Sequence, residues 1–172
     1  MRKANYDKFP STKLAGMLVQ GWDAIISVLK KQMDARKVLA VDLYTGVYEE
    51  EVLDAFSKEF SGKVMNVRDL MKPEQEIQTL TERFMTEDVL FGYVTNLKLE
   101  DYFDADKLAA AQKQISEAED TIVIIGTGAA MVAPQDAMIV YADMARWEIQ
   151  QRFRRHEAVS YTHLTLPTSD LV

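Results

Sequence analysis

Hydrophobic residues follow two patterns that alternate along the chain. Residues 21–33 carry apolar side chains at spacings of three and four, which predicts an amphipathic helix. Further segments with helical character are residues 48–60, 73–85 and 107–118, the last preceded by the capping residue Asp104. Apolar runs without helical spacing predict buried strands at residues 37–43, 63–67, 121–125 and 137–141. A final helical segment carries Arg146, Arg152, Arg154 and Arg155.

This alternation predicts an α/β fold, with an open, mostly parallel sheet and flanking helices. Residues 88–96 fit either a strand or a lid loop, and the pattern leaves both open. In open parallel sheets, ligands bind beyond the carboxyl ends of the strands. The residues expected there form the candidate site, namely Asp42, Gly46, Asp69, Gly126, Thr127, Gly128, Asp143, Arg152 and Arg155.

Most of these candidate site residues lie between residues 121 and 155. The first strand of this stretch ends at Gly126-Thr127-Gly128, where small residues let the backbone approach a ligand or a packed helix. The arginines that follow suit a phosphate or carboxylate, because guanidinium groups bind both. A simpler interpretation treats the glycines as a turn and the arginines as a solvated face. Asp143 and Asp69 likewise have two interpretations each, a functional carboxylate or a helix cap.

Composition excludes several kinds of chemistry. The 172 residues include no cysteine and two histidines, which leaves too few ligands for an ordinary zinc site. Neither a G-x-S-x-G turn nor an HExxH motif occurs, so no hydrolase triad or metalloprotease site is expected. The net charge of −7 disfavours nucleic acid and anionic membranes as partners. With no signal-peptide pattern and no apolar run long enough to span a bilayer, we expect a cytoplasmic protein.

The last residues differ in character from the rest of the chain. Residues 159–168, VSYTHLTLPT, resemble one translated reading frame of a transposase adaptor used in shotgun sequencing libraries. A ten-residue match to one frame is specific, so we expect the natural sequence to stop at Ala158. The domain is then residues 1–158, residues 159–172 are an artefactual tail that packs against nothing, and His156 is the native histidine.

The order of the segments resembles the uridine kinase branch of the P-loop fold. Residues 69–73, residues 126–128 and Asp143 with the arginines at residues 152–155 stand where that family has its own aspartate segment, glycine turn and arginine-rich helix. The resemblance implies Asp69 as general base and the arginines on transferring phosphates. The phosphate loop departs from the family pattern G-x-x-x-x-G-K-[ST], because residues 42–51 hold one glycine, Gly46, and no lysine. Three glutamates, residues 49–51, occupy the helix start that a phosphate would use, so the loop is degenerate.

A closer resemblance covers nearly all of residues 1–158. Its segments are NYDKFP at residues 5–10, QGW at residues 20–22, LYTGVY at residues 43–48, VLFGYVTN at residues 89–96 and WEIQQRFRR at residues 147–155. Together they resemble the amino-terminal region of long class I mannose-6-phosphate isomerase-like proteins of Bacteroidetes. In those proteins a kinase-like α/β domain precedes a cupin domain. The resemblance implies that the zinc site and the cupin domain of the parent protein lie beyond this fragment.

Three functional hypotheses follow. The first is a noncatalytic leading domain of a mannose-6-phosphate isomerase-like protein, which binds a sugar phosphate or nucleotide and contacts its own cupin domain. The second is a small-molecule kinase of uridine kinase type, in which Asp69 is the base. The third is a structural scaffold without a ligand, and the sequence does not separate it from the first.

Overall fold

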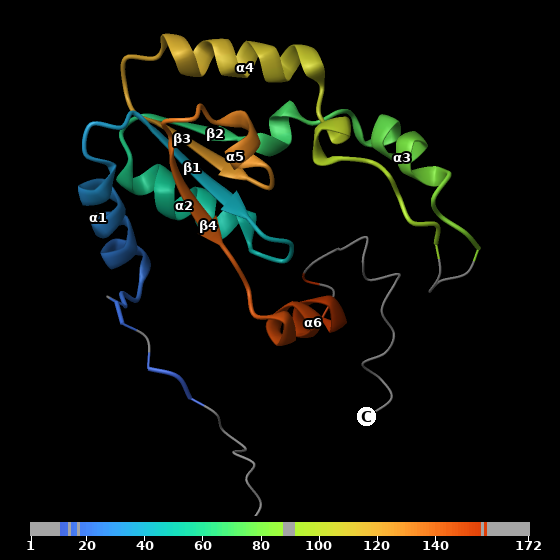
Figure 1. Cartoon of the computed structure of the whole chain (residues 1–172), viewed down its shortest axis with the longest axis horizontal. Coiled ribbons are helices and arrows are strands. Elements are labelled where there is room, and N and C mark those ends of the chain that lie inside the picture. Colours follow the sequence, from blue (N-terminus) through green and yellow to red (C-terminus); the bar gives the residue numbers. More distant parts are fainter. Residues whose placement is uncertain (1–10, 14, 17, 88–91, 156, 158–172) are drawn as a thin grey trace, which may run out of the picture.

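The fold is a parallel four-stranded sheet with helices on both faces. The computed structural model describes residues 11–13, 15–16, 18–87, 92–155 and 157. The strands are β1 (Val38–Leu43), β2 (Lys63–Asn66), β3 (Ile122–Gly126) and β4 (Met138–Ala142), in the order β2-β3-β1-β4 (Figure 1). Every pair of neighbouring strands is parallel. The predicted α/β fold class and parallel sheet are therefore confirmed.

The helices alternate with the strands along the chain, as the hydrophobic pattern predicts. They are α1 (Trp22–Met33), α2 (Glu49–Glu59), α3 (Glu74–Glu82), α4 (Ala105–Glu117), α5 (Ala129–Val132) and α6 (Arg146–Arg154), with 3-10 helices η1 (Val67–Leu70) and η2 (Leu99–Tyr102). Asp104 caps α4 as expected, with its carboxylate accepting from the N–H groups of Asp106 and Lys107. The helix expected over residues 73–85 ends at Glu82, because α3 contributes no fully buried side chain that would extend its packing.

Two hydrophobic clusters hold the helices to the sheet, one on each face. On one face α1 and α2 pack Ile26, Val52 and Phe56 against alternate residues of β1 and β3. On the other face α4 and α5 pack Ile115 and Val132 against the intervening residues of the same strands. Strand β3 is buried along its whole length, which explains its continuous apolar sequence.

The segment between η1 and η2 lies apart from this core. Figure 1 shows α3 and the chain that follows it reaching away from the sheet. Residues 92–98 contain neither helix nor strand. Residues 88–91 lie outside the described residues. The prediction of either a strand or a lid loop over residues 88–96 is therefore tested for residues 92–96, where no strand occurs. The expected tail at residues 159–172 also lies outside the described residues.

The strand order places a topological switch between β1 and β3. The chain leaves β1 towards α2 on one face, and it leaves β3 towards α5 on the opposite face. Loops that diverge from two adjacent parallel strands open the crevice in which ligands bind in this class of sheet. The candidate residues are therefore judged by their positions around this point.

Candidate functional site

The turn after β3 is closed by a carboxylate from β1. Asp42 Oδ1 accepts from the backbone N–H of Gly128 at 3.2 Å, and Asp42 Oδ2 accepts from that of Ala130 at 2.9 Å. These N–H groups belong to the start of α5, and the carboxylate satisfies both of them. The hydroxyl of Thr127 donates to the carbonyl of Leu43 at 3.0 Å, which ties the same turn to the end of β1. The structure thus brings Gly126, Thr127 and Gly128 together, with the carboxylate of Asp42 on the N–H groups of Gly128 and Ala130.

The glycines of this turn have steric reasons to be glycine. Gly126 has φ +140°, and a Cβ there would lie 2.7 Å from Cβ of Val67. Gly128 precedes α5 in the left-handed conformation, with φ +87°, and a Cβ would lie 3.1 Å from Cδ2 of Leu99. The positive φ and the close neighbours therefore explain why both positions are glycine, without any role for a ligand.

The loop after β1 is covered by α6. Arg152 Nη1 donates to the carbonyl of Gly46 at 2.7 Å, and its guanidinium carbon lies 3.6 Å from the centroid of the Tyr48 ring. Ile149 is buried, and a Cβ at Gly46 would lie 3.6 Å from its Cγ2. Helix α6 therefore rests on the loop that joins β1 to α2.

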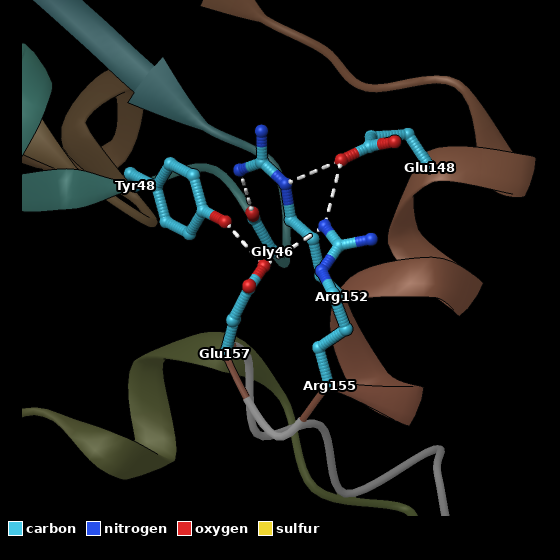
Figure 2. A network of polar contacts seen from close by, with 6 residues as sticks. All are labelled: Gly46, Tyr48, Glu148, Arg152, Arg155 and Glu157. Atoms are coloured by element: carbon cyan, nitrogen blue, oxygen red, sulfur yellow. Dashed lines mark hydrogen bonds and ion pairs between the residues drawn. The ribbon is translucent and has the colours of Figure 1, made fainter.

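Around Arg152 the charges neutralise one another. Glu148 Oε1 accepts from Arg152 Nε at 3.1 Å and from Arg155 Nη2 at 3.2 Å. Arg155 also pairs with Glu157 at 2.8 Å, and the Tyr48 hydroxyl donates to Glu157 at 2.6 Å (Figure 2). We call these five residues, Tyr48, Glu148, Arg152, Arg155 and Glu157, the α6 latch.

The latch shifts the acid–base properties of its members. The hydrogen bond from Arg155, followed by that from the Tyr48 hydroxyl, lowers the pKa of Glu157 to about 2. The hydrogen bond from Arg152 lowers the pKa of Glu148. The pKa of Arg155 is raised, first by its bond to Glu157. Each guanidinium thus has a carboxylate partner within the protein, and neither arginine presents an unopposed charge to an external phosphate.

Two of the three glutamates at the start of α2 contact side chains of neighbouring elements. Glu49 pairs with Arg68 at 3.0 Å, which joins the start of α2 to η1. Glu51 accepts from the indole N–H of Trp22 at 2.9 Å, which joins it to α1. Glu49 and Glu51 therefore hold neighbouring elements together.

The other two predicted carboxylates lie at the surface. Asp69 is exposed on η1, where Asn66 and not Asp69 supplies the capping oxygen, to the N–H of Arg68. Asp143 is exposed after β4, and its Oδ1 accepts from the N–H of Met144 at 2.7 Å. Neither carboxylate lies at the first residue of a helix in the manner of a cap.

An aromatic pair that the sequence did not single out lies beside Asp143. The rings of Tyr44 and Tyr141 meet edge to face, with centroids 6.4 Å apart. The pKa of Tyr141 is raised, first by partial burial and then by the charges of Asp143 and Asp42. The surface beside the carboxyl end of β4 is therefore aromatic and negative, which suits a neutral or cationic group better than a phosphate.

Sequence reasoning also missed two residues of the latch, Glu148 and Glu157, and it considered Tyr48 as a cleft residue without its contacts to Arg152 and Glu157. A signal existed for one of them, since Glu148 and Arg152 are four residues apart on one helix and such pairs commonly bond. Nothing in the sequence connects Tyr48 with Glu157 across 109 positions.

Two further properties concern the described part of the chain. It contains no group of three acidic, histidine or cysteine side chains placed to hold a metal ion. Among its helices, none combines the length and the apolar character that a bilayer crossing requires.

Fold and site together define a three-layer α/β domain in which a carboxylate of β1 closes the turn after β3 and α6 covers the loop after β1. Residues 21–167 match the family described as "Domain of unknown function (DUF8485)", and the chain belongs to this family. The match includes every strand and helix of the structure and continues past Ala158, so the adaptor origin of residues 159–168 stays a prediction. No curated protein and no solved structure matches the chain.

Proposed function

We propose that this domain is the noncatalytic leading part of a mannose-6-phosphate isomerase-like protein of carbohydrate metabolism, acting in the cytoplasm as a scaffold for its cupin domain. One observation carries the noncatalytic assignment: both places where the fold would hold a phosphate are filled from within. The carboxylate of Asp42 accepts hydrogen bonds from the N–H groups after β3, and α6 lies on the loop after β1.

The filled positions favour a scaffold over a phosphate-binding domain because of charge. A phosphate at the turn after β3 would replace the carboxylate of Asp42, and two anions near the same N–H groups repel each other. A phosphate at Arg152 would compete with Glu148 for a guanidinium that also stacks on Tyr48. A sugar phosphate therefore enters this site only after the protein gives up contacts of its own.

Descent from a P-loop kinase fold is the structural part of the proposal. The degenerate loop at Gly46 follows the first strand, and the glycine turn at residues 126–128 follows the strand beside it. A working kinase of uridine kinase type is the alternative. It has no observation in its favour here, because Asp69 is exposed on η1 and no lysine accompanies Gly46.

The parent protein supplies the decisive test. Reads extended past the codon for Ala158 are expected to encode a cupin domain with zinc ligands, since this fragment lacks them. In the full-length protein, Asp42→Asn and Arg152→Ala are expected to change kcat for mannose 6-phosphate less than about two-fold while lowering the melting temperature. An open reading frame without a cupin domain, or a folded Arg152→Ala enzyme with kcat reduced more than ten-fold, overturns the proposal.

A further inference from the structure

Strand β4 forms an unprotected edge of the sheet. Within the described residues it pairs with β1 on one side and with no strand on the other. Its sequence, MIVYA, contains no charge and no proline. Ile139 and Tyr141 are 49% and 59% exposed on one face of the strand. Natural proteins cover or charge such edges, because an open apolar edge pairs with other chains.

The start of α1 lies at the same end of the sheet as the end of β4. Trp22, the first residue of α1, bonds to Glu51 in the first turn of α2, which follows the carboxyl end of β1. From there α1 runs back to Met33, within the hydrophobic cluster that also holds Met138, Val140 and Ala142 of β4. The chain before Trp22 thus arrives beside the open edge.

We propose that the segment before α1, of which residues 11–13, 15–16 and 18–20 are described, pairs with this edge as a fifth, parallel strand, giving the order β2-β3-β1-β4 followed by the new strand. Ten extended residues span about 33 Å, whereas the five residues of β4 need about 17 Å. Leu18, 95% exposed in the described conformation, then gains apolar neighbours.

The handedness of the connection supports this placement. Passing from the new strand through α1 to β1 moves across the sheet in the same direction, and over the same face, as passing from β1 through α2 to β2. The connection from β3 through α5 to β4 reverses both direction and face, so it has the same hand. The connection from β2 through α4 to β3 runs in the same direction and over the same face as that from β3 to β4. All four crossovers then share one hand, as parallel β-α-β units almost always do.

Charge favours this segment over a second copy of the chain. Residues 1–20 contain four basic residues and one acidic residue, whereas β4 is flanked by Asp136 and Asp143. Symmetric antiparallel pairing of two β4 strands would bring Asp136 of one copy towards Asp143 of the other. The segment is also tethered to the domain, which gives it an effective concentration of about millimolar.

Engineered cysteines test the pairing cleanly, because the chain has none of its own. Leu18→Cys and Val19→Cys are each combined with Ile139→Cys and Tyr141→Cys, since neighbouring residues of a strand face opposite sides. The control combines Leu18→Cys with Tyr93→Cys, which is 70% exposed on the projecting segment. At least one of the four pairs is expected to form an intramolecular disulfide ten-fold faster than the control, at a rate independent of protein concentration.

Rates equal to the control overturn the proposal, and so do disulfides between chains whose rate rises with concentration. A second measurement uses residue-resolved hydrogen exchange in the full chain. Leu18→Asp is expected to speed exchange at the outward-facing amides of β4 at least ten-fold relative to the unmodified chain. Equal exchange in the two proteins overturns strand pairing.

Discussion

The guanidinium carbon of Arg152 lies over the ring of Tyr48, 3.6 Å from the centroid, while the same group donates to the carbonyl of Gly46. Arg152 thereby contacts the middle and the last residue of the short loop, residues 44–48, that joins β1 to α2. The residue that the sequence assigns to an external phosphate is used to hold the last helix on the body of the domain. Most of its side chain is buried, at 15% exposure, so these contacts are shielded from solvent.

Replacing Arg152 with alanine is expected to destabilise the protein by about 2–3 kcal/mol, because it removes a cation–π contact and a charge-assisted hydrogen bond. For a domain of this size the melting temperature falls by about 5–10 °C. The control is Arg146→Ala, at an exposed position on the same helix. Thermal denaturation followed by circular dichroism measures both, and equal melting temperatures for the two variants contradict the latch.

Gly126→Ala is expected to cost more than about 3 kcal/mol, because the new Cβ adds a clash to the backbone strain of a positive φ. That Cβ would lie 2.7 Å from Cβ of Val67, which is itself buried. Gly21→Ala separates the two effects, since Gly21 has φ +89° with no atom within 4 Å of the added Cβ. It is expected to cost about 1–2 kcal/mol. Urea denaturation at equilibrium gives both values, and equal losses would show that packing at Gly126 is unimportant.

The four strands could be predicted to within one residue at each end, because β-branched runs covered on both faces carry a strong signal. Helix α5 could not, since four residues are too few for a helical period. The order of the strands was not predicted either. It depends on which helices cover which face, and each helix pattern alone fits either side of the sheet.

Several site residues were found from the rule that ligands bind at the carboxyl ends of parallel strands, but their contacts were not. Asp42 was expected near the glycine turn, yet its bonds to Gly128 and Ala130 join residues 86 and 88 positions apart. Arg152 and Gly46 are 106 positions apart. Contacts at such separations depend on the assembled fold, and a single sequence holds no local signal for them.

Acid is expected to release the latch as the pH falls from about 4.5 to about 2. The folded-state pKa of Glu157, about 2, lies below its ordinary value of 4.5. The stabilisation from this carboxylate is therefore complete above pH 4.5 and is lost as the pH falls through the folded-state pKa. The indole N–H signal of Trp147 in α6, followed by NMR, is expected to shift across this range.

Glu157→Gln should reduce that pH dependence to the part that Glu148 contributes, because the glutamine carries no titrating proton and the pKa of Glu148 is also lowered. Glu117→Gln is the matched control, since Glu117 makes an exposed pair with Lys113 on α4, far from the latch in sequence. A Trp147 signal with the same pH profile in Glu157→Gln as in the unmodified protein contradicts the role of Glu157.

Asp42→Asn is expected to destabilise the domain by about 1.5–3 kcal/mol. The carboxylate uses both oxygens, one for Gly128 and one for Ala130, whereas an asparagine has one acceptor and turns an amide N–H₂ towards a backbone donor. Asp143→Asn is the control, because that exposed carboxylate bonds to the neighbouring N–H of Met144. Its cost is expected to be within about 0.5 kcal/mol. Equal losses in urea denaturation would show that Asp42 does not hold the turn.

Ligand titrations distinguish the noncatalytic domain from a kinase. A ligand at 100 times its dissociation constant adds about 2.7 kcal/mol of stability, which raises the melting temperature of a domain this size by about 5–10 °C. We expect less than about 1 °C from Mg-ATP, because the helix after the degenerate loop begins with Glu49, Glu50 and Glu51. Mannose 6-phosphate is expected to behave alike, since Asp42 already occupies the N–H groups it would use. A clear shift with Mg-ATP that Asp69→Ala abolishes and Asp143→Ala preserves would restore the kinase and exclude the noncatalytic domain.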